Sequence, residues 1–256
     1  MAHLFKLATA LGVFALATAT PACAADEEIQ VYMDELNPAG VFGLDVHVND
    51  VLRGDRTPAY SGGETNLHRW RVTPEFSLGL GHGFELGAYL PLATIAPDGV
   101  LRIQGVKGRL KWLAPHKDEG FYWGLNFEIG RVGHRLDQNP WNSELKLIGG
   151  WRRGKWIAAV NGNIDFTVSG PAPGPATFEL ASKLGYALTP ALTLGVESYN
   201  GMGELKSWGH LSQNEHASYL VLDAKLGKWD VNAGIGKGYG ANGDDVVLKF
   251  VIGVPI

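Results

Sequence analysis

The 256-residue sequence has few of the features that mark soluble enzymes or nucleic-acid-binding proteins. Charged residues make up only 19% of it, less than in a typical soluble domain, and the formal net charge is -4. This balance argues against the basic patch or stripe of a nucleic-acid-binding protein. A G-x-S-x-G nucleophile motif, His-rich metal spacing and cofactor motifs are all missing, so we expect no cofactor, no metal and no catalytic residues.

The N-terminus is typical of a secretory signal peptide. Lys6 supplies a short positive region, and residues 7–19 are apolar but too few to span a bilayer. Ala22-Cys23-Ala24 supplies the small residues that a signal peptidase requires, so we predict a signal peptide over residues 1–24. Beyond it no apolar run of about 20 residues occurs, and the sequence therefore predicts no transmembrane helix.

Cys23 is the only cysteine of the chain. Cleavage after Ala24 removes it, so we expect neither a disulfide nor thiol chemistry in the mature protein. The alternative is a lipoprotein with Cys23 as its lipidated first residue, but Thr20-Pro21-Ala22 matches the apolar lipobox pattern poorly.

Alternating apolar and polar side chains predict β-strands along most of the remaining chain. In residues 70–78 the apolar side chains take every even position and the polar ones take the odd positions, on opposite faces of a strand. Most such segments are ~10 to 14 residues long, a little over what a tilted strand needs to cross hydrocarbon. About twelve can be counted: 41–52, 67–80, 84–95, 102–114, 121–132, 141–152, 155–168, 177–188, 191–200, 216–227, 229–238 and 245–256.

The connections between these segments alternate between short and long. Tight turns follow the even-numbered segments, whereas several longer polar connections follow the odd-numbered ones: 53–66, 132–140, 169–176 and 201–215. This asymmetry and the even number of strands are typical of bacterial outer-membrane barrels. The sequence therefore predicts an all-β fold over residues 41–256, a closed antiparallel up-and-down transmembrane β-barrel. Both chain ends are expected in the periplasm and the long loops outside.

A soluble β-sandwich would also alternate, but two features argue against it. The apolar face is large and unbroken in almost every segment. Aromatic residues also gather at the segment ends, as expected for the two interfacial girdles of a barrel. Those near the turns include Phe84, Trp112, Phe121, Trp123, Trp151, Trp156 and Trp229; those toward the loops are Phe42, Trp70, Trp141, Phe166 and Phe178.

Residues 25–40 precede the first predicted strand. They contain Ile29-Gln30-Val31-Tyr32, which has the pattern of a short strand. A periplasmic position, pairing with a barrel end and folding into the lumen are all compatible with this sequence.

Several phrases of the mature chain resemble one family: Glu28-Ile29-Gln30-Val31-Tyr32, Thr73-Pro74-Glu75-Phe76, Phe84-Glu85-Leu86-Gly87, Tyr89-Leu90-Pro91-Leu92, Lys107-Gly108-Arg109-Leu110-Lys111-Trp112 and Gly124-Leu125-Asn126-Phe127-Glu128. The family is that of outer-membrane β-barrel porins grouped with proteins of the phenol meta-cleavage pathway. The resemblance implies the barrel fold and assigns no catalytic or binding residue. The chain departs from outer-membrane barrels in ending with Val254-Pro255-Ile256, because the barrel assembly machinery usually reads a terminal aromatic residue.

If the apolar face meets lipid, the opposite face lines the lumen. This inner face is polar and strongly charged, and we predict twelve residues of it to line a pore: Arg69, Arg71, Glu75, Glu85, Lys107, Arg109, Lys111, Glu128, Glu144, Asn161, Asn163 and Asp165. A basic row on one strand comprises Lys107, Arg109 and Lys111. Three acidic residues of neighbouring strands are expected near this row: Glu75, Glu85 and Glu128.

Two interpretations of this inner face remain open. The charges can select small solutes in a narrow polar pore, as rings of charge do in channels. They can also pair across a barrel of about twelve strands and fill it, since buried charges must be paired or hydrated. We therefore predict an outer-membrane channel for passive or facilitated diffusion of small polar or aromatic-derived solutes. The alternative is a non-conducting structural or interaction barrel with an ion-paired, filled lumen.

An enzyme is the third class, and the sequence does not favour it. His47 and Ser77 face inward, but Ser77 lies on the periplasmic half of its strand, far from the outer leaflet. Five residues of the outer loops have metal-binding chemistry without metal-ligand spacing: Glu64, His68, Asp137, His210 and His216.

The expected partners are outer-membrane lipid, the barrel assembly machinery and small solutes.

Overall fold

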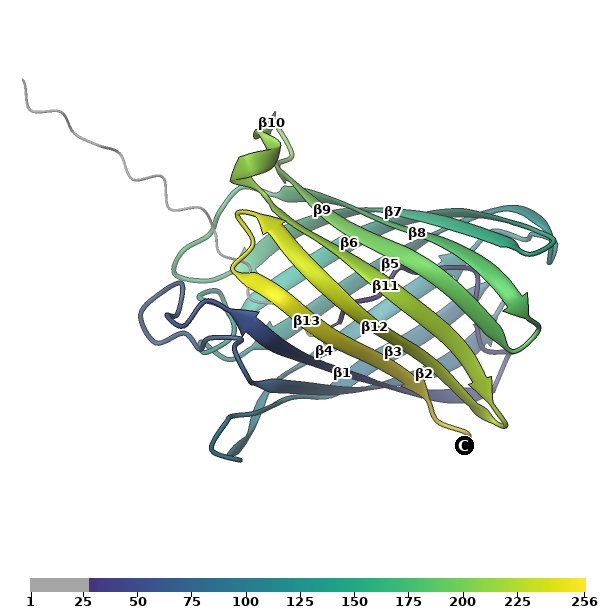
Figure 1. Cartoon of the computed structure of the whole chain (residues 1–256), viewed down its shortest axis with the longest axis horizontal. Helices are drawn as coiled ribbons and strands as arrows, with labels where there is room; N and C mark the ends of the chain where they lie inside the picture. The colour runs from purple at the N-terminus through teal and green to yellow at the C-terminus, as the bar shows by residue number, and fades with distance from the viewer. Residues whose placement is uncertain (1–27) are drawn as a thin grey trace, which may run out of the picture.

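The computed structural model describes residues 28–256, so the predicted signal peptide lies outside the described residues. Twelve long strands form one antiparallel sheet that closes on itself (Figure 1). They are β1 (Phe42–Gly54), β2 (Trp70–Gly81), β3 (Phe84–Ile95), β4 (Leu101–Leu113), β5 (Gly120–Val132), β6 (Trp141–Arg153), β7 (Trp156–Ser169), β8 (Thr177–Thr189), β9 (Leu192–Glu204), β11 (Glu215–Leu226), β12 (Trp229–Gly240) and β13 (Asp244–Gly253). The predicted fold is confirmed.

Each long strand pairs with its neighbours in sequence, and β1 pairs with β13 to close the ring. The closing register places Val46 opposite Ile252 and Val48 opposite Phe250. Closure leaves no free sheet edge, which matters because lipid cannot hydrogen-bond to an unpaired backbone group. The twelve predicted segments and the twelve long strands correspond one to one.

One expectation about local structure was wrong, and one question that the sequence left open is answered. The connection expected at 201–215 is partly ordered: β9 continues to Glu204, and β10 (Ser207–Trp208) and the short helix η1 (Leu211–Gln213) follow. Residues 29–32 form no strand, although they have the pattern of one. The wall strands already use their backbone groups on each other, so no edge is left for these residues to pair with.

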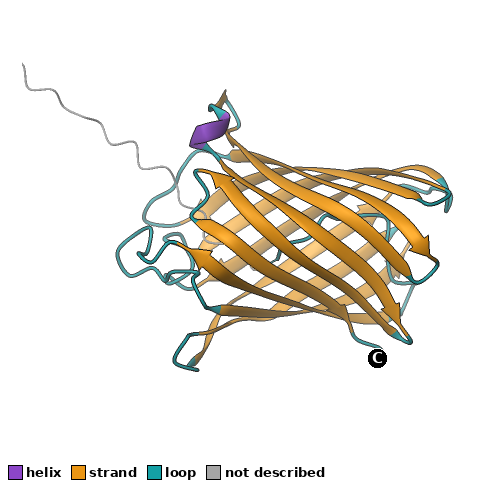
Figure 2. Cartoon of the chain, in the orientation of Figure 1, coloured by secondary structure: helices purple, strands orange, loops and turns teal. Residues whose placement is uncertain are grey.

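The two ends of the barrel differ as the sequence predicts. Tight turns lie at one end, together with the C-terminus, and the longer connections lie at the other (Figures 1 and 2). We call them the turn end and the loop end. Aromatic side chains cluster at both ends. The ring centres of Trp112 and Trp123 are 5.2 Å apart at the turn end, and those of the stacked Phe178 and Trp208 are 5.7 Å apart at the loop end.

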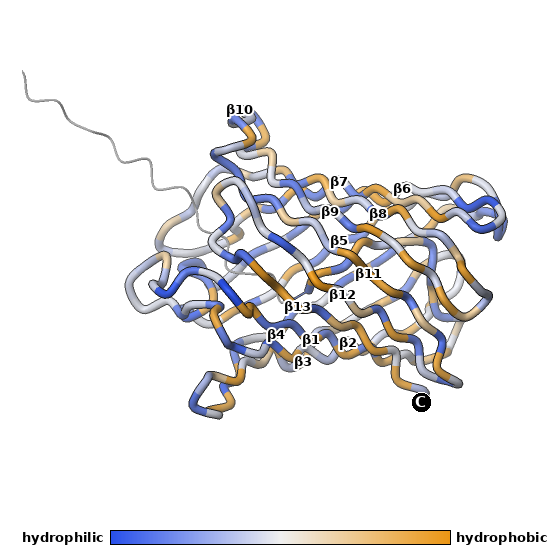
Figure 3. The backbone as a smooth tube through the Cα atoms, in the orientation of Figure 1, coloured by the Kyte–Doolittle hydropathy of each residue, from blue (hydrophilic) through white to orange (hydrophobic). Residues whose placement is uncertain are grey.

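The outer face of the barrel is a broad apolar band. Leucines at the middle of the strands point outward, and Leu147, Leu184 and Leu220 are each more than half exposed. Figure 3 shows the alternation of apolar and polar positions along the strands. The interior positions are mostly polar or charged and are buried. No helix among the described residues is long and apolar enough to cross a membrane.

The apolar band predicts a depth-dependent penalty for charge. Leu147 is 54% exposed at the centre of β6, so Leu147→Arg places a cation in hydrocarbon. We expect it to lower the free energy of unfolding by about 2–4 kcal/mol, measured by denaturant titration in lipid vesicles. Leu211→Arg is the control, because Leu211 is 68% exposed in η1 beyond the band. Equal losses in both variants would contradict the assignment of the band.

Candidate functional site

Residues 28–40, here called the inner segment, run through the lumen before the chain turns into β1. Figure 2 shows them as an irregular coil inside the ring of strands. Side chains of the wall bind the segment's backbone. The Tyr32 N–H donates to Asn161 Oδ1 at 2.6 Å, and Asn161 Nδ2 donates to the Tyr32 carbonyl at 2.9 Å. Lys249 Nζ donates to the Ile29 carbonyl at 3.0 Å. Side chains of the wall thus make the hydrogen bonds to the segment's backbone that a neighbouring strand would otherwise make.

The inner segment extends from the loop-end half of the lumen to the turn end. Ile29 packs in a cluster with Val51, near the loop end of β1. Tyr32 packs with Leu113 and Tyr122, which lie near the turn end of their strands. Farther along, Arg152 donates to both carboxylate oxygens of Asp34 at 2.9 Å. The segment is therefore fixed along its whole described length.

The backbone of the segment passes close to the wall at Gly79 of β2. The Gly40 N–H donates to the Gly79 carbonyl at 2.8 Å. A Cβ atom at position 79 would overlap the carbonyl oxygens of Asn37 and Pro38. Asn37 is also held by its N–H, which donates to Glu85 Oε2 at 2.7 Å. Glycine at position 79 lets the chain turn from the lumen into β1 against the wall.

Tyr32 is the central side chain of the inner segment. Its hydroxyl lies 2.5 Å from the Tyr89 hydroxyl and donates to Glu128 Oε1 at 3.1 Å. Lys146 Nζ lies 4.1 Å from the centre of the ring, and Lys111 Nζ lies 5.1 Å from it. Cations at these distances are attracted by the π face of an aromatic ring. The Tyr32 ring thus lies near several cations, while its hydroxyl contacts a second phenol and a carboxylate.

Ion pairs connect the strands around the segment. Arg109 of β4 binds Glu75 of β2 and, at 2.7 Å, Glu85 of β3. On the opposite wall, Glu197 binds both Lys249 and Lys183, and the Lys183 distance is 3.1 Å. Arginine suits a shared position of this kind because its planar guanidinium can serve two carboxylates at once. These pairs compensate charges that the lumen would otherwise leave desolvated.

Water has no access to the middle layer of the lumen. In an open pore, side chains that face the lumen would be wet, yet His47, Asn126, Asn161, Glu197 and Lys249 are each at most 2% exposed. Every other long strand except β12 also contributes a buried side chain: Glu75, Tyr89, Arg109, Lys146, Lys183 and Val221. On β12 the position is Gly236, against which the Tyr219 ring packs. Side chains therefore fill the middle layer of the lumen.

At the loop end, two of the long connections contact each other. The connection between β1 and β2, residues 55–69, folds onto the connection between β5 and β6: the Glu64 N–H donates to the Arg135 carbonyl at 2.9 Å. The Glu64 carboxylate lies 3.0 Å from both Arg69 and Arg135. The Tyr60 hydroxyl donates to the His134 carbonyl at 2.9 Å, and burial raises the pKa of Tyr60 to about 12. Tyr60 therefore stays a donor at any physiological pH.

The twelve residues predicted to line a pore lie on the inner face of the wall or at its rim. As expected, acidic residues surround the basic row: Arg109 binds Glu75 and Glu85, and its register partner is Glu128. The others take separate positions. Arg69 and Arg71 lie at the loop end, Lys111 and Asn161 hold the inner segment, Glu144 pairs with Lys146, and Asn163 donates to Glu179. Lys107 and Asp165 lie on β4 and β7. Their pore-lining role stays a prediction.

The structure does not bring together the residues considered for catalysis or for an outer metal site. His47 hydrogen-bonds to Glu75, whereas the Ser77 hydroxyl accepts from Asn37 at 2.8 Å. Among residues 28–256, one group of His and carboxylate side chains has mutually close donor atoms, and it comprises Glu28, His47 and Glu75. None of the five loop residues belongs to it.

Sequence reasoning did not assign roles to Glu28 and Tyr32. Both lie in the segment for which the sequence left three positions open, and their partners come from distant strands. Burial, together with the nearby Glu128 carboxylate, raises the pKa of Glu28. An acidic residue next to a short apolar stretch does not by itself indicate a buried position inside a barrel.

No protein-family model matches the chain, and no curated protein is similar to it in sequence. Solved structures do share its fold. The KdgM porin has a TM-score of 0.57 at 12% identity over 84% of this chain and 99% of its own. An outer-membrane channel from Pseudomonas putida F1 has a TM-score of 0.56 at 11% identity over 89% and 100%. The NanC porin has a TM-score of 0.50 at 11% identity over 82% and 97%.

These likenesses concern the fold, and with the apolar band they define the class: the protein is an outer-membrane β-barrel with a fold similar to that of porins. Its place is the outer membrane, and its outer face contacts membrane lipid. The narrower grouping with the phenol meta-cleavage family stays a prediction.

The shared position of Arg109 predicts a large effect of its loss. Arg109→Met leaves two buried carboxylates, Glu75 and Glu85, without their common cation. We expect the free energy of unfolding to fall by about 3–5 kcal/mol, measured by denaturant titration in vesicles. Arg53→Met is the matched control, since Arg53 is an exposed partner of Asp245 and exposed pairs contribute little. A loss no larger than that of the control would show that the lumen pairs are hydrated and weak.

Proposed function

We propose that this protein is an outer-membrane channel for small polar or aromatic-derived solutes and that the inner segment holds it closed in the state described. The observation that carries the proposal is that a segment outside the paired strands fills a polar lumen. All twelve long strands pair with one another, so the wall loses none of its ladder hydrogen bonds when residues 28–40 leave.

The chemistry of the lumen supports a path for polar solutes. The wall facing the segment carries amide, ammonium, guanidinium and carboxylate groups, which water can solvate once the segment leaves. A barrel of about twelve strands lies between small filled barrels and the wide aqueous porins, so only small solutes would pass. Solutes would meet charged side chains on every side, as in selective channels.

The position of Tyr32 supports the aromatic part of the proposal. Its ring occupies a space bordered by Lys146 and Lys111, and its hydroxyl is hydrogen-bonded by Tyr89 and Glu128. When the segment leaves, the same groups remain on the wall. A small phenolic solute can then make the contacts that the Tyr32 side chain makes in the closed state.

One observation favours the alternative, a non-conducting structural or interaction barrel. Ion pairs between side chains of the inner face lie on both sides of the segment, around Arg109 on one wall and around Glu197 on the other. If these pairs stay in place without the segment, they fill the lumen themselves. The two functions therefore differ in what remains when the segment is removed.

Conductance in planar bilayers tests the proposal. We compare the mature protein with a variant that lacks residues 25–37 and keeps the turn into β1. The mature protein is expected to be mostly silent and the truncated one to show discrete steps in most insertions. The control lacks residues 171–175 of the β7–β8 connection and should stay silent. If the truncated protein is folded by circular dichroism and also silent, the non-conducting barrel is the correct interpretation.

A second variant keeps the test valid if the truncated protein does not fold. Asn161→Ala removes both hydrogen bonds to the Tyr32 backbone and leaves the segment in the chain. We expect it to open more often than the wild type, since the segment is held less firmly. An unchanged opening frequency would count against the proposal.

The solute class has its own prediction. In the truncated channel, 4-hydroxybenzoate is expected to reduce single-channel current at millimolar concentration, because its ring and hydroxyl can take the place of Tyr32. Cyclohexanecarboxylate has the same charge but no π face and no hydroxyl, and it should reduce the current much less. Equal reduction by both compounds would show that the lumen does not recognise a phenol.

A further inference from the structure

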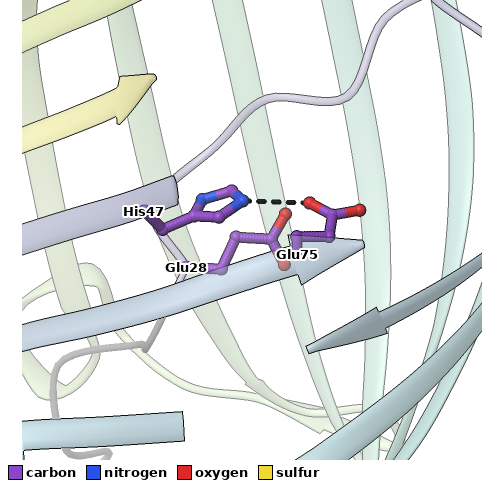
Figure 4. Close-up of side chains that lie close together, drawn as sticks. All are labelled: Glu28, His47 and Glu75. Carbon is purple, nitrogen blue, oxygen red and sulfur yellow. Dashed lines mark hydrogen bonds and ion pairs between the residues drawn. The ribbon is translucent and has the colours of Figure 1, made fainter. Parts of the chain in front are cut away.

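Three side chains with metal-ligand chemistry converge where the inner segment passes β1 and β2 (Figure 4). Glu28 belongs to the segment, His47 to β1 and Glu75 to β2. Each offers one donor atom, and these atoms all lie within 4.8 Å of one another. Figure 4 shows the Glu28 carboxylate near the imidazole of His47 and the carboxylate of Glu75.

The register of the barrel fixes the two wall ligands. His47 lies opposite Thr73, and Glu75 lies opposite Asp45, so His47 and Glu75 are diagonal neighbours on the inner face. His47 Nε2 lies 2.9 Å from Glu75 Oε2. The other carboxylate oxygen of Glu75 binds Arg109, which also serves Glu85. Arg109 therefore orients Glu75 from behind, as outer partners orient the ligands of metal sites.

The group is incompletely satisfied. Glu28 Oε1 is shielded from water and has no hydrogen-bond partner among residues 28–256. His47 Nδ1 also has none among them, but it lies on the side of the ring away from Glu75. Buried polar groups in proteins nearly always have a partner, so each such atom requires an explanation. Within the same residues, no lysine or arginine forms a salt bridge to Glu28; nearby Lys146 pairs with Glu144 at 3.1 Å.

The surrounding charges have the sign that favours a cation. The acidic groups near the site are Glu28, Asp45, Glu75, Glu85, Glu128 and Glu144, whereas the permanent cations are Arg109, Lys111 and Lys146. The acidic groups outnumber the cations in this part of the lumen. A divalent ion bound by Glu28 would favour the ionised form of its carboxyl group, which burial disfavours.

We propose that Glu28, His47 and Glu75 form a binding site for a divalent transition-metal ion of the Zn²⁺ type, which fastens the inner segment to the barrel wall. One imidazole nitrogen and two carboxylate oxygens are ligands that Zn²⁺ accepts, at about 2.0–2.2 Å. Tetrahedral donors at that distance are roughly 3.4 Å apart, so modest side-chain rotation closes the group around an ion. Mg²⁺ and Ca²⁺ prefer six or more oxygen ligands and fit this set poorly.

The site joins a segment residue to two wall residues, so it exists only when the segment is in the lumen. A bound ion therefore stabilises the closed state by mass action. This effect on conduction rests on the proposed function. Metal binding itself does not, because it needs only the closed state that the structure describes.

Metal content of the full mature protein tests the proposal. The protein is refolded in detergent with Zn²⁺, because the site is buried in the closed state, and is then dialysed and measured by atomic emission. We expect about one ion per chain in the wild type and in the control His134→Gln, whose imidazole lies in an outer loop. Glu28→Gln and His47→Gln should each lose it. Refolding with Mg²⁺ should leave no bound metal.

Two results would overturn the proposal: a wild type without zinc, or variants that retain as much as the wild type. Glu28 lies outside the barrel wall, so Glu28→Gln keeps the test valid if His47→Gln does not fold. The two proposals fail separately. Zinc in the wild type with a silent truncated protein refutes the channel alone, whereas a conducting truncated protein with no zinc in the wild type refutes the metal site alone.

Discussion

Backbone hydrogen bonding in the absence of water is the constraint on which the structure depends. Lipid offers no partner for an N–H or C=O group, so the strands must pair into a closed ring, and β13 must return to β1. Closure fixes one face of every strand toward lipid and the other toward the lumen. The alternation along each strand then decides that apolar side chains point outward and charged ones inward. Both the membrane position and the polar interior follow from this one requirement.

The polar interior creates a second problem, which the inner segment solves. Charges in a narrow lumen must be paired or hydrated, and the middle layer here excludes water. Arg109 and Glu197 provide pairs on opposite walls, but carboxamide and ammonium groups remain between them. An irregular segment has free carbonyl and N–H groups that such side chains can bind. A helix or strand would already have used those groups, which explains why Asn161 and Lys249 bind an irregular coil.

The alternation of apolar and polar residues predicted the strands of the barrel wall. No comparable pattern predicted the position of the inner segment that fills the lumen. The alternation around Val72 and Phe76 depends only on neighbours in sequence, so it is readable without a structure. The proximity of Glu75 and Glu85 to Arg109 follows from strand order, because neighbours in sequence are neighbours in the sheet. Tyr32 and Asn161, in contrast, are separated by 129 residues and are joined by no periodic pattern. A coil that binds side chains follows no register, so the sequence left its position open.

The separation between wall and contents also shapes how the lumen can change. The strands of the wall are held together by backbone hydrogen bonds. Lipid cannot replace these bonds, because it offers no donor or acceptor. The inner segment is held by hydrogen bonds to side chains and by small apolar clusters around Ile29 and Tyr32. Water can replace the hydrogen bonds when the segment leaves, but not the apolar contacts. Under the proposed function, the burial of Ile29, Val31 and Tyr32 opposes opening, whereas the pairing of the wall strands does not depend on the segment.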